Sequence, residues 1–362
     1  MSRAFVHIGA GKTGSTAIQY FLAHNEAALR ALGFAYPVAA AASTRRDGPN
    51  HNRLAYEIIE PARGRAERAL APALTRSARE MPVTLLSAEV LYMRPFESEF
   101  ASAEAYLAAK EAALDRLFHL LEPFETVDVL CYVRRHDRWI ESIYNERIKT
   151  GRERGTSFSE FVERYGRNHY RPQLDAWAKR AGVSVRPYEA AARGEGGLIG
   201  DFCRAVGIGA GLPEAPRSLR SANPALGRDF VEFARLAADL PLTRRQRARL
   251  ATGLVAISAQ EAATSPEPKS WSLFFGFDER RAFLDRFAAD DAEVARRYLS
   301  PDFERLFDAP SPSEHADYPG LSAERSFDIA GKLLDYDREL GSPVARRLRR
   351  YASKLMPGKR AG

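Results

Sequence analysis

Cysteine is scarce in this sequence of 362 residues, which contains two, Cys131 and Cys203. Two cysteines are too few for a disulfide framework or a zinc cluster, and both lie in apolar segments, which predicts buried thiols in a reducing compartment. The chain has no run of about eighteen uncharged apolar residues and no basic-then-apolar leader before its first apolar segment near Phe5. We therefore expect a cytoplasmic protein without a membrane span.

The chain also lacks a motif that would organise its positive charge for nucleic acid. It carries 54 Lys and Arg against 47 Asp and Glu, and the formal net charge of +7 favours anionic ligands in general. The basic residues are spread out, with no zinc finger or RNA-recognition signature, so no nucleic-acid partner is expected. The densest basic cluster, residues 344–360, predicts either a solvated terminal helix or a helix in peripheral contact with an acidic membrane surface. The oligomeric state cannot be read from these patterns.

Short β-branched or apolar runs alternate with segments of helical period in the first half of the chain. The runs begin at Ala4, Phe34, Val83, Val127 and Val183. Helical patterns cover residues 15–32 and 103–121, among others. Such alternation predicts an α/β fold with a central parallel sheet and helices on both of its faces. After Pro187 the strand pattern ends and successive helices are expected, so we predict a core over residues 1–210 and a helical C-terminal extension over 211–362 that ends in the basic tail.

A glycine-rich segment, IGAGKTGST, follows the first predicted strand and opens a predicted helix. Unpaired amides at the start of a helix and glycines that let the backbone approach closely are the features of a phosphate-binding loop. The groups that this loop offers come from Gly9, Gly11, Lys12, Thr13, Gly14, Ser15 and Thr16. The segment therefore predicts an anion cradle.

This loop differs from the loop that binds nucleoside triphosphates. That signature needs a glycine at position 6, where this chain has Val6 inside the strand. The triphosphatases also hold magnesium with an aspartate at a strand end, whereas the strand from Val127 ends in Arg134 and Arg135. A kinase or ATPase is thus the weaker interpretation.

A second anion site is predicted where the strand from Val127 ends. Arg134 stands at the strand end and Ser142 lies eight residues later in an amphipathic helix. A guanidinium and a hydroxyl can converge on one phosphate, although a solvated arginine pair would fit this segment alone about as well.

The two motifs together resemble the sulfotransferases that use 3′-phosphoadenosine 5′-phosphosulfate (PAPS). KTGST is similar to their 5′-phosphosulfate loop, with Gly11 where proline is usual, and Arg134 and Ser142 match the pair that grips the 3′-phosphate, with His136 where proline is common. The likeness covers roughly residues 3–207 and implies a P-loop-like sulfotransferase fold of bacterial type. It also implies that Lys12 supplies charge near the bridging oxygen, and that PAPS serves as co-substrate without a metal.

The resemblance implies that a sulfuryl group moves to a hydroxyl or amine, which requires a base for the acceptor's proton. Glu89 follows the strand from Val83 and should emerge at the ligand-bearing edge of the sheet. Ser87 would face the same edge and contact the sulfate. His51, in a polar loop, is the second candidate for the base because it titrates near neutrality. The alternatives are that Glu89 caps a helix and that His51 is a surface residue.

The acceptor is the least defined part of the prediction. Several segments are rich in Arg, Asn, His and Tyr, and they offer His51, Tyr170 and Arg171 as contacts for the acceptor. Such segments suit a carbohydrate or glycolipid, and would also serve a lipid head group or a phenol. Two other functions compete with sulfotransfer: a non-catalytic protein on the same fold that binds a nucleotide or glycan, and a P-loop kinase.

Overall fold

The computed structural model describes residues 1–38, 48–60, 65–93, 100–209, 212, 225–264, 274–311 and 318–339. They form two compact units. The first contains the described residues within 1–135, 169–222 and 287–308, and the second those within 136–168, 223–286 and 309–362. This division differs from the single boundary near residue 210 expected from the sequence, because the end of the strand pattern marks the end of the sheet and not the end of a unit. The basic cluster 344–360 lies outside the described residues.

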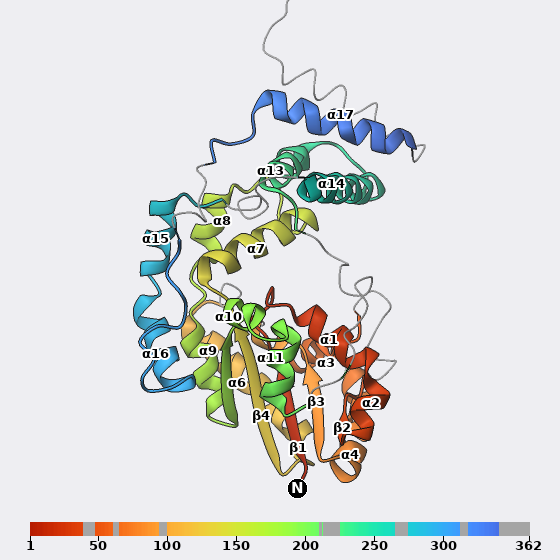
Figure 1. Ribbon diagram of the computed structural model, residues 1–362, viewed down its shortest axis with the longest axis vertical. Helices are drawn as coiled ribbons and strands as arrows, with labels where there is room; N and C mark the ends of the chain where they lie inside the picture. Colours follow the sequence, from red (N-terminus) through yellow and green to blue (C-terminus); the bar gives the residue numbers. More distant parts are fainter. Residues whose placement is uncertain are drawn as a thin grey trace, which may run out of the picture. The chain divides into compact units, whose positions relative to one another are not determined.

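A five-stranded parallel sheet forms the centre of the first unit (Figure 1). The strands are β1 (Arg3–His7), β2 (Phe34–Ala35), β3 (Val83–Ser87), β4 (Thr126–Val133) and β5 (Gly182–Pro187). They lie in the order β2-β3-β1-β4-β5, and every neighbouring pair is parallel. Each run predicted to be a strand contains one, and the α/β class with a parallel sheet is confirmed.

Helices connect these strands and follow the last of them. They are α1 (Ser15–His24), α2 (Glu26–Ala31), α3 (Asn52–Ile59), α4 (Arg65–Glu80), α5 (Val90–Met93), α6 (Ala103–Leu121), α9 (Tyr170–Ala178), α10 (Tyr188–Arg193), α11 (Gly197–Val206) and α16 (Ala288–Tyr298). The helical pattern over residues 15–32 is interrupted at Asn25, whose side-chain amide donates to the carbonyl oxygen of Phe21 at 2.9 Å. The described residues after Pro187 contain helices and no strand, as predicted.

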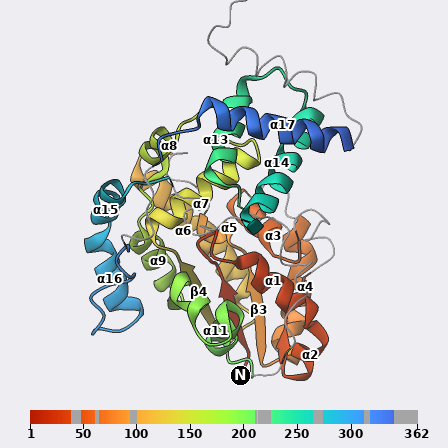
Figure 2. The same ribbon diagram turned by 45° about the horizontal axis from the view of Figure 1, so that its top comes forward.

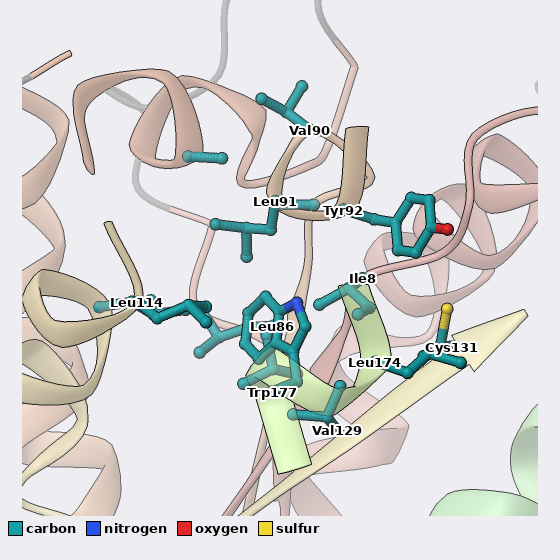
Figure 3. Packing of buried hydrophobic residues seen from close by; sticks show 14 of the residues in the cluster. Ile8, Leu86, Val90, Leu91, Tyr92, Leu114, Val129, Cys131, Leu174 and Trp177 are labelled. Atoms are coloured by element: carbon teal, nitrogen blue, oxygen red, sulfur yellow. The ribbon is translucent and has the colours of Figure 1, made fainter. Parts of the chain in front are cut away.

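Alternation along the strands sends successive side chains to opposite faces of the sheet. Val6 and Val129 belong to one core cluster with residues of α3, α4, α6, α9 and α16, while Leu85 and Leu130 belong to another with residues of α1, α2 and α11. Figure 3 shows the first cluster, in which the fully buried Trp177 of α9 packs among the side chains of β3 and β4. Helices therefore cover both faces, as a parallel sheet requires.

The strand order fixes where a ligand site can form. From β1 the chain passes to β2 and β3 on one side and then crosses to β4 and β5 on the other. The carboxyl end of β1 is therefore the point where the connections diverge, and open parallel sheets bind ligands in the crevice outside such a point. The predicted anion loop begins at this end of β1.

Both cysteines are free thiols, with Cys131 buried in β4 and Cys203 partly buried in α11. Burial raises the pKa of Cys203 to about 11 and that of Cys131 further. None of the described helices combines the length and the apolar character that crossing a membrane requires.

The second unit has helices and no strand among its described residues. They are α7 (His136–Lys149), α8 (Phe158–Tyr165), α13 (Arg228–Leu236), the 3-10 helix η2 (Ala237–Asp239), α14 (Arg244–Thr264), α15 (Phe277–Asp285) and α17 (Ala323–Glu339). Helices α13, α14 and α17 lie side by side in both views (Figures 1 and 2).

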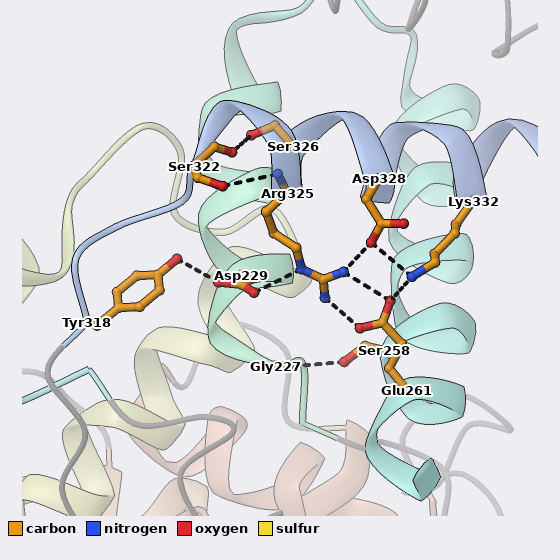
Figure 4. Close-up of polar contacts among 10 residues, drawn as sticks. All are labelled: Gly227, Asp229, Ser258, Glu261, Tyr318, Ser322, Arg325, Ser326, Asp328 and Lys332. Carbon is orange, nitrogen blue, oxygen red and sulfur yellow. Dashed lines mark hydrogen bonds and ion pairs between the residues drawn. The ribbon is translucent and has the colours of Figure 1, made fainter. Parts of the chain in front are cut away.

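Charged side chains tie the helices of this unit together. Arg325 of α17 donates to Asp229 of α13 at 3.0 Å and to Glu261 of α14, and Lys332 donates to Glu261 at 2.7 Å (Figure 4). The fully buried Arg280 of α15 donates to Asp137 and Glu141 of α7.

Candidate functional site

The loop after β1 has the backbone of an anion-binding turn. Gly9, Gly11 and Lys12 have φ angles of 44°, 56° and 59°, and among the described residues Lys12 alone has a positive φ without being glycine. Positive φ angles at Gly9 and Gly11, on either side of Ala10, give the alternation that turns successive backbone amides toward a common concavity. A lysine in this region is held there by its surroundings at an energetic cost, which is typical of functional sites.

A side chain at either of two loop glycines would displace a neighbouring side chain. A Cβ on Gly11 would lie 2.3 Å from the sulfur of Met93, and one on Gly14 would lie 2.3 Å from Cδ2 of Leu198. Proline fixes φ near about −65°, so the φ of 56° at Gly11 excludes proline in this conformation. A proline at position 11 would therefore require a different turn.

Helix α1 begins directly at this loop. The first amides bonded within the helix are those of Ala17 and Ile18, which both donate to the carbonyl oxygen of Gly14. The amides of Ser15 and Thr16 thus precede the hydrogen-bonded part of the helix, where the dipole contributes partial positive charge.

Two buried polar atoms line the inner side of the loop without a hydrogen-bond partner, Thr13 Oγ1 and His7 Nε2. Each would lie 3.4 Å from a Cβ on Gly9, so both flank that glycine. Unsatisfied buried polar atoms are rare and point to a water or ligand that completes them. A water or an anion in the loop would complete both atoms.

Arg134, directly after β4, lies against this loop. Its Nη1 donates to the carbonyl oxygen of Lys12 at 3.1 Å, and its Nε donates to Glu189 at 3.2 Å. The guanidinium also lies 5.3 Å from the ring centre of Tyr188. Two segments predicted separately as anion sites, 122 positions apart in sequence, thus meet at one edge of the sheet.

Sequence reasoning missed Glu189 and Tyr188, which begin α10 after β5. Their position directly behind a predicted strand was the available signal, because the carboxyl ends of parallel strands meet at one edge. Glu189 offers Arg134 a partner that an incoming anion would have to replace or share.

The prediction that Tyr170 contacts an acceptor is not supported by its position. The side chain is fully buried, and its hydroxyl donates to the carbonyl oxygen of Arg134 and accepts from the amide of Arg134. Burial raises the pKa of Tyr170 well above its ordinary value. Tyr170 therefore fixes the backbone of Arg134 instead of facing a substrate.

Arg171, the second predicted acceptor contact, pairs with Asp290 of α16 at 3.2 Å and is about half exposed. Ser142 lies in α7, in the second unit, so its predicted contact with the 3′-phosphate stays a prediction of the sequence. Within the described ranges, no group of three or more His, Cys, Asp and Glu side chains is arranged to hold a metal ion.

Glu89 lies just beyond β3, half-buried in a polar network. Gln19 Nε2 donates to Glu89 Oε2 at 2.9 Å and to Ser87 Oγ at 3.2 Å, and Asn52 Nδ2 donates to Glu89 Oε1 at 3.0 Å. His7 Nδ1 lies 2.8 Å from Ser87 Oγ, because His7 and Ser87 are register partners at the ends of β1 and β3. We call these five residues the Glu89 network.

Ser87 is fully buried within the Glu89 network, which does not fit its predicted contact with sulfate. Its hydroxyl accepts from Gln19, so the remaining hydroxyl proton is available to His7 Nδ1. Burial lowers the pKa of His7 from 6.5 to about 4, so this imidazole is neutral near pH 7.

His51 is buried and not a surface-loop histidine, and its ring is fully used in backbone contacts. Its Nδ1 accepts from the amide of Ser87 at 3.1 Å, and its Nε2 lies 3.2 Å from the carbonyl oxygen of Pro37. Burial lowers its pKa to about 4 despite these hydrogen bonds. A general base needs a nitrogen within reach of the acceptor, so this environment argues against both predicted roles of His51, base and acceptor contact.

No protein-family model matches the chain, and no solved structure matches it. An uncharacterized protein from Archaeoglobus fulgidus is 29% identical over 175 residues, which is 47% of this chain and 45% of that protein. The chain thus aligns with less than half the length of that relative, whose name assigns no activity.

Proposed function

We propose that this protein is a PAPS-dependent sulfotransferase that acts on a hydroxyl or amine acceptor. The observation that carries the proposal is the hydrogen bond from Arg134 Nη1 to the carbonyl oxygen of Lys12. It joins the two segments whose residues resemble the 5′-phosphosulfate loop and the 3′-phosphate site of that family. A ligand with phosphate groups at both ends needs two such sites at one sheet edge.

The roles follow from the charges that the reaction develops. The acceptor oxygen or nitrogen attacks sulfur, the bond from sulfur to the bridging oxygen breaks, and adenosine 3′,5′-bisphosphate leaves. Lys12 and the amides at the start of α1 offset the charge on the leaving phosphate, and Arg134 holds the 3′-phosphate, with Ser142 as its predicted partner. Glu89 takes the acceptor's proton.

The acceptor stays at the level of a hydroxyl or amine. His51 and Tyr170 are buried and make backbone contacts, so neither supports a carbohydrate or glycolipid site in particular. Sulfation is therefore best assayed against a panel that includes saccharides, glycolipids, phenols and amines.

Calorimetric titration with adenosine 3′,5′-bisphosphate tests the cofactor assignment. We expect binding without magnesium, and a loss of about 10- to 100-fold in affinity for Arg134→Ala, which removes a charged hydrogen-bonding group. Arg193→Ala is the matched control, since Arg193 has the same charge, is exposed and pairs with Asp308.

The titration and an assay of sulfation together give three outcomes that separate the competing functions. Tight binding of ATP with magnesium in place of the bisphosphate would identify a kinase-like protein. Bisphosphate binding without sulfation of any acceptor, together with an unchanged bisphosphate affinity in Glu89→Gln, would identify a binding protein. Sulfation that Glu89→Gln slows by about 10²- to 10⁴-fold, with bisphosphate affinity retained, would support the proposal in full.

A further inference from the structure

Glu89 is held by a side-chain amide on each of its two carboxylate oxygens. Gln19 donates to Oε2 at 2.9 Å and Asn52 donates to Oε1 at 3.0 Å. The two amides come from α1 and α3, helices that pack on opposite faces of the sheet. An ionised carboxylate can only accept hydrogen bonds, so the two donors fix the direction of both carboxylate oxygens.

Each amide is oriented by a further contact. Asn52 Oδ1 accepts from the amide of Val90 at 3.4 Å, which leaves Nδ2 to face the carboxylate. Gln19 Nε2 uses its second hydrogen on Ser87 Oγ at 3.2 Å. Reversing either amide would bring an oxygen against the carboxylate, so the network specifies donors at both positions.

His51 anchors the segment that carries Asn52. Its backbone amide donates to the carbonyl oxygen of Ser87 at 2.9 Å, and its ring accepts from the amide of Ser87 at 3.1 Å. The start of α3 is thereby fixed to the end of β3, two residues before Glu89. The buried histidine thus sets the distance between Asn52 and Glu89.

We call Gln19 and Asn52 the Glu89 clamp. Helix α1 links Gln19 to the anion loop. Ser15, in its first turn, and Gln19 are four positions apart and are both buried. Residues at this spacing share one face of a helix. Any ligand held at the start of α1 is therefore bound by the same rigid element that holds Oε2 of Glu89.

We infer that Gln19 and Asn52 are positioning residues that hold Glu89 as an oriented base beside the anion loop. The inference rests on the proposed function, because that proposal assigns the base to Glu89. It adds that the orientation of the base comes from the helix that binds the cofactor and from α3.

Isosteric substitutions test the clamp without an activity assay. Gln19→Glu and Asn52→Asp each replace a donor by an oxygen within about 3 Å of the carboxylate, and two adjacent carboxylates cannot both ionise easily, so one pKa rises strongly. Three titratable groups of the neighbouring described segments, Tyr36, His7 and His51, are kept neutral near pH 7 by burial.

Carbon-13 NMR of labelled glutamate carboxyl groups, assigned with Glu89→Gln, reports the titration of Glu89. In Gln19→Glu and Asn52→Asp we expect the last step of the coupled titration to lie at least about one pH unit above the midpoint of the parent. Gln260→Glu, at an exposed position of α14, is the matched control and should leave the midpoint unchanged. An unchanged midpoint in both test variants would overturn the clamp.

Kinetics test whether the clamp positions the base. In Gln19→Leu, kcat should fall about 10- to 100-fold, while the affinity for adenosine 3′,5′-bisphosphate stays within about twofold. Asn52→Leu should show the same effects and replaces Gln19→Leu if that buried variant does not fold. A parent-like kcat in a folded variant would refute the positioning role. Absence of bisphosphate binding in the parent would instead reject the sulfotransferase proposal, and the NMR titration would still decide the clamp.

Discussion

Acid should destabilise this protein through two histidines that are buried in the neutral form. Burial lowers the pKa of His7 and of His51 from 6.5 to about 4. Between these two values the unfolded chain binds protons that the folded chain does not bind. The free energy of unfolding therefore falls as the pH falls from about 6.5 to about 4, and the full contribution of each neutral histidine is present above pH 6.5.

The size of the effect follows from the difference in pKa. A difference of about 2.5 between the unfolded and folded values, at about 1.4 kcal/mol for each pKa unit, gives about 3 kcal/mol for each histidine. Urea denaturation followed by tryptophan fluorescence, repeated from pH 7.5 to 4, measures this loss. Carboxylates also titrate near pH 4, but they do so in parent and variant alike. The difference between the two proteins in free energy of unfolding therefore isolates the contribution of the histidine.

His51→Gln is the decisive variant, because an amide can reproduce one accepted and one donated hydrogen bond without titrating. Its free energy of unfolding should fall about 3 kcal/mol less than that of the parent between pH 6.5 and 4. His24→Gln, at the exposed end of α1, controls for the loss of an imidazole. Equal slopes for parent and His51→Gln, or a parent that gains stability on acidification, would refute the reasoning.

Two further substitutions test the packing. Arg280→Met should destabilise the second unit by about 3–5 kcal/mol in urea denaturation, because it leaves two buried carboxylates without their cation. The exposed Arg281→Met should leave the free energy of unfolding nearly unchanged, and equal denaturation midpoints for the two variants would contradict the argument. Gly14→Ala should cost more than the roughly 1–2 kcal/mol of a left-handed alanine, since its Cβ would also meet Leu198, and should weaken bisphosphate binding in calorimetry. Gly207→Ala, with a φ of 82° and open space around it, carries the backbone strain alone, so equal losses in the two alanine variants would exclude the clash.

The sheet and its loop could be predicted because their signals are local. The near-continuous apolar run over residues 127–133 reflects a strand buried on both faces, and similar runs indicated the other four strands. The glycines around Lys12 indicate positive φ angles wherever the segment folds, since other residues rarely adopt them. These features need no knowledge of distant contacts.

The sequence by itself thus determined the class of fold, the order of strands and helices along the chain, and the position of the glycine-rich loop. The tertiary structure decided which polar side chains face solvent, because burial depends on residues far away in sequence. A polar loop predicted an accessible His51, yet contacts with Pro37 and Ser87 bury its ring. Gln19 looked like an ordinary helix residue until β3 brought Glu89, 70 positions later, within 2.9 Å of its amide.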